Sequence, residues 1–195
     1  MGKKIVIVQG HPDGDPNRLC RALAGAYAQG AAAAGHDVSR IDLAAIDFPL
    51  LKTQGEFTGG DMPAALKPAW EAILAANHIV IVFPLWLGTM PALLKAFLEQ
   101  VMRPHFAYDY SKTGGWPKQR LKGRSARLVV TMGMPAMLYR LFYLSHGVAG
   151  LRRGILNFVG IRPVRTTLIG MVEAAGGARR AAWLERMRRL GAAAL

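Results

Sequence analysis

Three stretches of this sequence gather residues that suit ligand binding. The first is QGHPDGDPNRL, in which His11, Asn17 and Arg18 offer hydrogen-bond donors just before an expected helix. The free N–H groups and the dipole of a helix N-terminus favour an anion such as phosphate. Asp13 and Asp15 place negative charge in the same loop, so an ordinary capped turn is the alternative interpretation.

The second stretch is FPLWLGTMP, at the end of an apolar run. Gly88 lets the backbone approach a ligand closely, and Trp86 and Leu87 supply apolar surface. Backbone amides in such a loop would suit the edge of a flat heterocycle. The alternative interpretation is a tryptophan of the core, followed by the turn that starts a helix.

The third stretch is TMGMPAMLY, where Thr131, Gly133 and Pro135 predict another exposed turn at the end of a strand. Its methionines favour flexible packing around a pocket over a metal site. Three such loops at one edge of a sheet would suit a ligand that has both a phosphate and a flat ring. A flavin is a ligand of this kind.

The elements that position these loops alternate along the chain. The local patterns predict five strands: residues 3–10, 36–43, 78–84, 125–133 and 164–170. The first and third are short apolar runs rich in β-branched residues, which predicts strands buried on both faces. Helical patterns lie between the five strands, which predicts one α/β domain over residues 1–195. We expect a flavodoxin-like three-layer sandwich with a five-stranded parallel sheet in the order 2-1-3-4-5. Ligands bind such sheets at the carboxyl ends of the strands, here residues 9–17, 84–90 and 131–139.

Local signals predict the limits of several elements. Asp15 and Pro16 predict the N-cap and the first residue of a helix that runs to about Gly35. Segments rich in Pro and Gly are expected to be irregular: residues 45–60 and 103–124. The apolar segment 136–159 predicts helical pieces interrupted at its glycines: Gly147, Gly150 and Gly154.

Composition narrows the classes of function. The chain has 195 residues, 52% of them hydrophobic, and a net charge of +13. Residues 1–100 hold eight Lys and Arg against nine Asp and Glu, whereas the remainder holds 17 against three. A basic half is typical of proteins that bind nucleic acid, a membrane surface or an anionic ligand, or it is a solvated face.

The cysteine count and the lack of targeting or membrane-spanning patterns set further expectations. Cys20 is the single cysteine, which excludes an internal disulfide and a cysteine metal cluster. The sequence has neither the pattern of a signal peptide nor an apolar run long enough to span a membrane. We therefore expect a cytoplasmic protein without a bound metal.

Four blocks of the chain resemble the NAD(P)H:quinone oxidoreductase family, flavodoxin-like flavoproteins related to DT-diaphorase. The blocks are GHPDGDPNRLCRALA, HIVIVFPLWLGTMPALLKAFLEQV, HFAYDY and LKGRSARLVVTMGMPAMLYR. The resemblance covers roughly residues 3–160. It implies a homodimer whose bound flavin passes two electrons from NAD(P)H to a quinone in a ping-pong cycle. FMN is expected rather than FAD, because the larger members that hold the FAD adenine use additional chain.

The resemblance also implies roles for individual residues. His11, Asn17 and Arg18 would surround the flavin phosphate. The residues implied to border the flavin ring are Pro84, Leu85, Trp86, Leu87, Gly88, Thr131, Met132 and Gly133. The aromatic residues implied to line the substrate side in dimers are Tyr108 and Tyr110. The implied catalytic pair near the N1 and O2 edge of the ring is Tyr139 and His146, with His146 balancing negative charge and Tyr139 sharing the proton.

Two rival functions follow from the same residues. Some related flavoproteins are ancillary subunits of potassium-efflux systems, which would give the basic half a transporter or membrane partner. Nucleic-acid binding is the other rival. We expect none, because the sequence has no recognition motif and its aromatic residues do not interleave with the basic ones.

Overall fold

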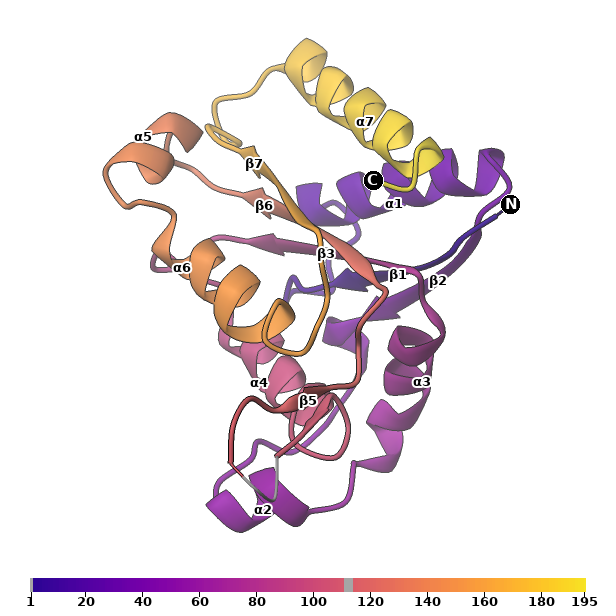
Figure 1. The fold of residues 1–195 in the computed structure, drawn as a ribbon. Helices are drawn as coiled ribbons and strands as arrows, with labels where there is room; N and C mark the ends of the chain where they lie inside the picture. Colours follow the sequence, from indigo (N-terminus) through magenta and orange to yellow (C-terminus); the bar gives the residue numbers. More distant parts are fainter. Residues whose placement is uncertain (1, 111–113) are drawn as a thin grey trace.

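A five-stranded parallel sheet forms the centre of the computed structural model, which describes residues 2–110 and 114–195 (Figure 1). The strands are β1 (Lys4–Gln9), β2 (Asp37–Asp42), β3 (His78–Pro84), β6 (Ser125–Thr131) and β7 (Val164–Ile169). They lie in the order β2-β1-β3-β6-β7, and every neighbouring pair is parallel. The predicted flavodoxin-like order 2-1-3-4-5 is therefore confirmed, with β6 and β7 as the fourth and fifth strands.

Two short strands pair outside this sheet. They are β4 (Tyr108–Asp109) and β5 (Lys118–Gln119), which are antiparallel to each other. The prediction of an irregular segment over 103–124 therefore missed a small ribbon, whose two-residue strands are too short to produce an alternating pattern. Residues 111–113 of that segment lie outside the described residues.

Helices cover both faces of the sheet. The α-helices are α1 (Leu19–Ala33), α2 (Gln54–Gly59), α3 (Lys67–Ala75), α4 (Ala92–Val101), α5 (Ala136–Leu141), α6 (His146–Ala149) and α7 (Gly177–Ala192). Three short segments are 3₁₀ or π-helical: η1 (Leu43–Ala45), η2 (Ala64–Leu66) and the π-helical η3 (Gly150–Leu156). Over the described ranges, no helix combines the length and the apolar character that crossing a membrane requires.

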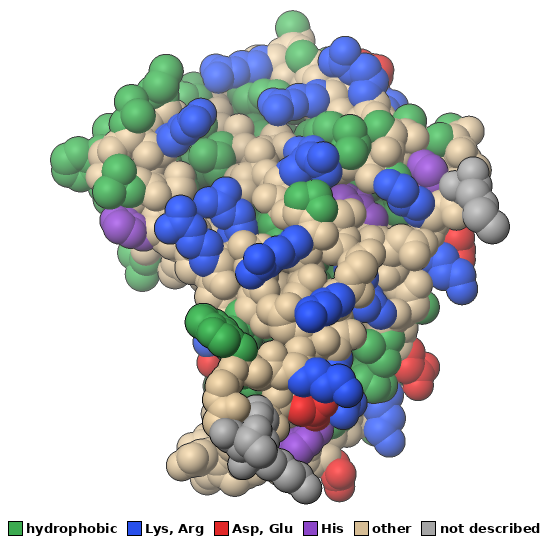
Figure 2. Space-filling view, viewed as in Figure 1, with side chains coloured by type: hydrophobic (Ala, Val, Ile, Leu, Met, Phe, Trp, Pro, Cys, Tyr) green, Lys and Arg blue, Asp and Glu red, His purple; other side chains and the backbone are tan. Residues whose placement is uncertain are grey.

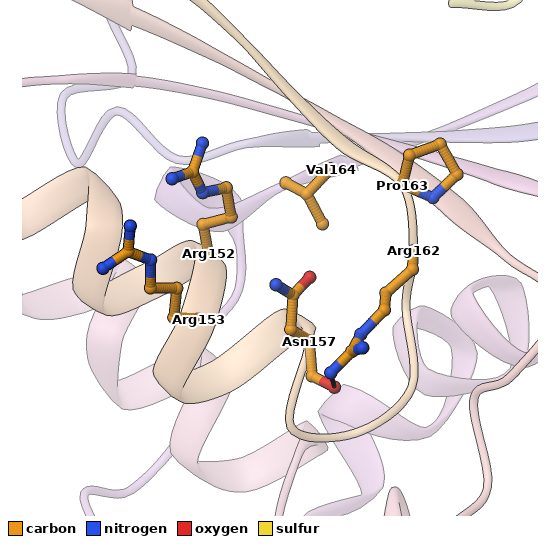
Figure 3. Close-up of a pocket in the computed structure, with 6 residues that line it drawn as sticks. All are labelled: Arg152, Arg153, Asn157, Arg162, Pro163 and Val164. Atoms are coloured by element: carbon orange, nitrogen blue, oxygen red, sulfur yellow. Dashed lines mark hydrogen bonds between the residues drawn. The ribbon is translucent and has the colours of Figure 1, made fainter.

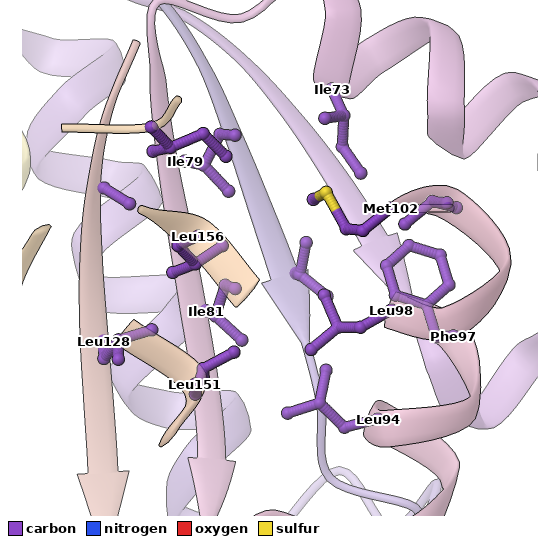
Figure 4. Close-up of a cluster of buried hydrophobic side chains, with 14 of the residues drawn as sticks. Ile73, Ile79, Ile81, Leu94, Phe97, Leu98, Met102, Leu128, Leu151 and Leu156 are labelled. Carbon is purple, nitrogen blue, oxygen red and sulfur yellow. The ribbon is translucent and has the colours of Figure 1, made fainter. Parts of the chain in front are cut away.

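Side-chain alternation along β1 divides the core into two layers. Ile5 and Ile7 pack towards α1 and α7, whereas Val6 and Val8 face α3, α4 and η3. Figure 4 shows the second layer, where Phe97 and its neighbours on α4 pack against the sheet. Burial on both faces explains why β1, β3 and β6 are nearly continuous apolar runs, whereas the edge strands β2 and β7 are more polar and more exposed.

The first helix begins later than predicted. α1 starts at Leu19 with Arg18 at the N-cap, not at Pro16 after a cap by Asp15. The Asp15 carboxylate instead accepts a hydrogen bond from the Asn17 N–H at 2.9 Å and closes a local turn. The predicted Asp15 cap is wrong because this turn satisfies the carboxylate before the helix begins.

The apolar segment 136–159 breaks at a different place from the predicted one. Its three glycines lie inside the continuous helix that α6 and η3 form. The break falls between α5 and α6, where Leu144 and Ser145 adopt left-handed φ angles of 48° and 52°. No Pro or Gly marks this break, so the rules for turn residues point to the wrong positions.

The loop predicted over 45–60 contains the short helix α2. Thr53 and Glu56 form a reciprocal capping box, in which each side chain accepts a hydrogen bond from the other residue's N–H. This pair of contacts satisfies two free donors of the helix N-terminus. The helix-starting contacts of Thr53 and Glu56 therefore outweigh the low helix propensity of the glycines from which a loop was predicted.

Helices α1 and α7 meet through two glycines. A Cβ at Gly30 would overlap the carbonyl oxygen of Arg188, and one at Gly191 would overlap the carbonyl oxygen of Tyr27. The two backbones therefore touch directly, with no room for a side chain between them. This close approach closes the helical layer over Ile5 and Ile7.

Gly30→Ala is expected to lower the free energy of unfolding by about 2–3 kcal/mol, because the two helices must move apart. Urea denaturation followed by circular dichroism measures the change. Gly25→Ala in the same helix is the matched control, because no atom lies within 4 Å of its added Cβ. It should be neutral or stabilise by up to about 1 kcal/mol. Equal destabilisation by both substitutions would contradict the close contact.

Candidate functional site

A cavity of about 540 Å³ lies at the carboxyl ends of β3 and β6. Its walls come from the loop after each strand and from the start of α6. The residues that line it are Leu85, Leu87, Gly88, Met132, Gly133, Met134, Tyr139, Tyr143 and His146. Two of the three loops predicted to bind a ligand therefore meet at one cavity, together with the predicted pair Tyr139 and His146.

The loop after β3 makes a tight turn beside the cavity. The Trp86 N–H donates to the Thr89 carbonyl at 2.9 Å, and the Thr89 N–H donates back to the Trp86 carbonyl at 3.0 Å. The central residues Leu87 and Gly88 have φ angles of 47° and 78°. Two successive positive φ angles are typical of a type I′ turn, which favours Asn-Gly.

Leu87 is an unusual residue for the first central position of this turn. A left-handed backbone costs a non-glycine residue about 1–2 kcal/mol, and this side chain is fully exposed at the cavity wall. Strain and an exposed apolar side chain at one residue point to a functional contact rather than to folding.

Tyr139 ties this turn to α6. Its side chain is buried, its hydroxyl donates to the Gly88 carbonyl at 3.0 Å, and the Val148 N–H donates to the hydroxyl oxygen at 3.3 Å. Burial raises the pKa of Tyr139, so the phenol stays protonated near neutral pH. The Tyr139 hydroxyl therefore connects the turn after β3 to α6 through two backbone partners. Its predicted part in sharing a proton with the flavin stays a prediction.

Gly147 brings α6 against the same turn. A Cβ at this position would overlap the carbonyl oxygen of Gly88 and the Cα of Thr89. The helix start is therefore packed backbone to backbone on the turn, and the preceding residue, His146, is left exposed at the cavity.

The loop after β6 forms the opposite wall. The Leu85 N–H donates to the Thr131 carbonyl at 2.7 Å, which holds the two loops side by side. The Thr131 hydroxyl lies 3.3 Å from the Cys20 sulfur and is buried, so its side chain does not reach the cavity. Burial raises the pKa of the Cys20 thiol to about 11, which keeps it protonated and poorly nucleophilic.

The first loop reaches the same end of the sheet through His11. The His11 ring lies edge-on to the Trp86 ring, with the centroids 6.0 Å apart. Its Nδ1 accepts a hydrogen bond from the Asp13 N–H at 3.0 Å, and burial lowers the pKa of His11. A neutral imidazole that accepts at Nδ1 carries its proton on Nε2, which can donate to a ligand.

The side chains of Asn17 and Arg18 form their polar contacts within the first loop itself. Arg18 forms an ion pair with Asp13, in which Nε lies 2.7 Å from Oδ2, and its Nε lies 3.6 Å from the Asp15 carboxylate. The Asn17 amide donates to Asp15 at 3.0 Å. These exposed side chains do not line the cavity, and two carboxylates offset the charge of Arg18.

Comparison with known proteins shows the family to which this chain belongs. Residues 3–190 match the sequence profile of proteins with a flavodoxin-like fold. The chain belongs to this family. Its resemblance to the NAD(P)H:quinone oxidoreductases is also confirmed, at the level of distant homology.

Individual relatives of this flavodoxin-like protein are similar in sequence, and solved structures are similar in fold. An NAD(P)H oxidoreductase of Haemophilus influenzae is 27% identical over 92% of this chain and 90% of its own. An FMN-dependent NADH:quinone oxidoreductase of Ruegeria pomeroyi is 27% identical over 69% of this chain and 72% of its own. The structure of an NAD(P)H:quinone oxidoreductase from Methanothermobacter marburgensis superposes with a TM-score of 0.82, at 22% identity and over 98% and 96% of the two chains.

Tyr108 and Tyr110 lie outside the cavity of this flavodoxin-like chain. Their rings are 5.3 Å apart, and Tyr108 is buried against Phe158 with the ring centroids 4.8 Å apart. In the single chain, this aromatic cluster belongs to the space between α4 and η3. Their predicted place on the substrate side depends on a second copy of the chain and stays a prediction, as does the homodimer.

Two residues at this end of the sheet were not singled out from the sequence. Tyr143 lines the cavity together with Met134; Met134 was expected to pack around the pocket, whereas Tyr143 lies beyond the loop over which we expected contacts. The second is Gln9, a buried residue at the end of β1 whose amide has no hydrogen-bond partner within the described ranges. An amide that ends an otherwise apolar strand, as in KIVIVQ, was the available signal.

Tyr139→Phe should lower the free energy of unfolding by about 1–3 kcal/mol, because the Gly88 carbonyl and the Val148 N–H both lose a buried partner. Thermal or urea unfolding measures the loss. Tyr143→Phe is the control, because this ring is exposed and its substitution should change stability by less than about 0.5 kcal/mol. Equal stability of wild type and Tyr139→Phe would show that the hydroxyl does not hold the turn.

Proposed function

We propose that this protein is a flavin-dependent NAD(P)H:quinone oxidoreductase. The observation that carries the proposal is the cavity between the loops after β3 and β6, beside the point where the strand order reverses between β1 and β3. In doubly wound sheets, that crevice is where ligands bind. Family membership and the activity named for the Ruegeria pomeroyi relative support the same assignment.

The cavity suits the ring of a flavin. Its volume of about 540 Å³ is within the usual range for small-molecule sites. Leu85, Leu87 and Met132 supply apolar walls, and the backbones of Gly88 and Gly133 are open to the edge of a flat ring. Contact of the Leu87 side chain with such a ring would bury its apolar surface and so offset the cost of its left-handed backbone.

The first loop suits the phosphate end of the cofactor. The N-terminus of α1 offers a positive dipole end, and His11 has a donor at Nε2. The unpartnered amide of Gln9 lies at the end of β1, where a buried group without a partner costs about 1–3 kcal/mol. We assign His11 and Gln9 to this end. Arg18 is a weaker candidate because it is paired with Asp13.

The chemistry of hydride transfer belongs to the flavin once it is bound. The chain supplies orientation, exclusion of water and control of charge. Tyr139 holds the turn at 86–89, and the apolar walls keep water from the reacting face. We assign His146, exposed at the cavity, the role of balancing negative charge. FMN is favoured over FAD by the FMN dependence of the Ruegeria pomeroyi relative.

The purified protein should absorb in the flavin region of the visible spectrum, or do so after reconstitution with FMN. It should then oxidise NADH or NADPH in the presence of a water-soluble quinone, with one hydroquinone formed per nicotinamide oxidised. Mass spectrometry of the cofactor released by heat identifies the flavin. A colourless protein that neither FMN nor FAD restores would contradict the proposal.

Leu87→Asn serves as the matched variant that ties the cofactor to the cavity. Asparagine suits the left-handed backbone, so the protein without cofactor should be equally or more stable. Flavin affinity should nevertheless fall, because an apolar wall becomes polar. Unchanged flavin affinity in this variant would place the ring elsewhere.

His146→Gln should lower the rate of quinone reduction by about a hundredfold if His146 balances charge at the flavin. Steady-state rates with a soluble quinone measure the effect. His105→Gln is the control, because His105 is also exposed and does not line the cavity. A rate equal to that of wild type would remove His146 from the reaction.

A further inference from the structure

The connection between α5 and α6 exposes a cluster of large apolar side chains, here called the apolar turn. Its members are Met137, Leu138, Leu141, Phe142, Tyr143 and Leu144. Leu141 and Phe142 are 65% and 74% exposed, whereas Tyr139 below them is buried. Contiguous apolar surface on a globular protein marks a site of interaction.

Basic residues predominate on the elements next to the apolar turn, and the Glu173 carboxylate lies beside Gly133 in the loop before α5. From residue 110 to residue 172 the sequence has 11 Lys and Arg and no Asp or Glu. Arg140 is exposed on α5, and Arg152 and Arg153 follow on η3, roughly 10 Å along the helix from His146. Figure 2 shows hydrophobic side chains at the corner of α5 and basic ones over the adjoining face.

The basic face holds a shallow hollow formed by three arginines. Arg152 and Arg153 of η3 and Arg162 of the loop before β7 surround Asn157 (Figure 3), and the hollow has a volume of about 540 Å³. Across the described ranges, none of the three arginines forms an ion pair with a carboxylate. The arginines are therefore uncompensated and suit phosphate groups from outside.

We propose that this face binds an anionic membrane surface. The apolar turn would enter the boundary between headgroups and acyl chains, and Arg152, Arg153 and Arg162 would bind the lipid phosphates. Apolar insertion combined with basic residues is the physical basis of peripheral membrane binding. A protein partner could account for the apolar side chains and a soluble anion for the arginines, but an anionic membrane accounts for both on one face.

Charge argues against a second copy of the chain as the partner of this face. A twofold axis that passes beside the arginine hollow would bring the hollows of two copies together, and none of the three arginines has a carboxylate partner in the described ranges. Anionic lipid offers the complementary charge, and its acyl region accepts Phe142 and Leu141.

The inference deepens the proposed function, on which its substrate assignment rests. Tyr143 belongs both to the apolar turn and to the cavity wall, and His146 follows it within three residues. A membrane-resident quinone with a long apolar tail would thus reach the cavity without crossing water. The reaction takes a hydride from NAD(P)H and a proton from solvent, and gives NAD(P)⁺ and the hydroquinone.

Vesicle binding tests the surface directly, without nicotinamide or quinone. We expect wild-type protein to sediment with phosphatidylcholine vesicles that contain phosphatidylglycerol, and to be released by salt. Phe142→Ser should weaken this binding by about tenfold or more. Each of Arg152→Gln and Arg153→Gln should weaken it by about fivefold. No binding by the wild-type protein would overturn the proposal.

Leu50→Ser and Arg40→Gln are the matched controls, because both residues are exposed and lie outside the segment that forms the proposed face. Arg40 is in β2, at the sheet edge opposite β7, and Leu50 is in the loop before α2. Both should bind vesicles as the wild type does. Equal losses in the controls and in Phe142→Ser would overturn the assignment of this face. Light scattering should give Phe142→Ser the mass of wild type, and a lower mass would assign the apolar turn to a second copy instead.

Activity with two quinones separates this inference from the proposed function. Phe142→Ser should reduce a water-soluble quinone at the wild-type rate and should lose activity towards a polyprenyl quinone embedded in the vesicles. Equal activity of variant and wild type on the embedded quinone would overturn the delivery route. If the wild-type protein reduced neither quinone, the proposed function would be contradicted. The vesicle-binding assay would still test the membrane-binding face, because it needs no quinone.

Discussion

The hydroxyl of Tyr139 is the contact on which the candidate site depends. It donates to the Gly88 carbonyl in the turn after β3 and accepts from the Val148 N–H in α6. A turn that leaves the end of a buried strand has backbone groups that need partners, and this one hydroxyl supplies a partner to two elements. Together with the backbone contact at Gly147, it fixes the cavity wall and the position of His146.

Some features that serve folding poorly lie near this contact. Leu87 holds a left-handed backbone while its side chain faces solvent, and Leu144 does the same between α5 and α6. The amide of Gln9 is buried without a partner in the described structure. Local conflicts of this kind are common where a protein meets a ligand or a partner. Others lie elsewhere, such as the buried Nε2 of His78 at the start of β3, so these three matter because they border the cavity end of the sheet.

The sequence predicted the parallel sheet because strands alternate with helices along the chain, and the inner strands are nearly continuous apolar runs. The strand order followed from the flavodoxin-like fold that five such strands suit. The sequence also predicted that the loops at residues 84–90 and 131–139 meet, because parallel strands end at one edge. It did not predict the late start of α1 or the break at Leu144 and Ser145, since each depends on a local turn or on packing rather than on residue type. The sequence also did not show that the Thr131 hydroxyl is buried against Cys20 or that Arg18 pairs with Asp13. Both depend on contacts that the spacing of residues along the chain does not encode.

The central claim is that the cavity at the ends of β3 and β6 holds the ring of a flavin. A crystal structure of the protein soaked with FMN tests it most directly. We expect ring density between residues 85–88 and 132–134, with the phosphate beside His11 at the start of α1. Ring density elsewhere, such as against Tyr108 and Phe158 between α4 and η3, would contradict it.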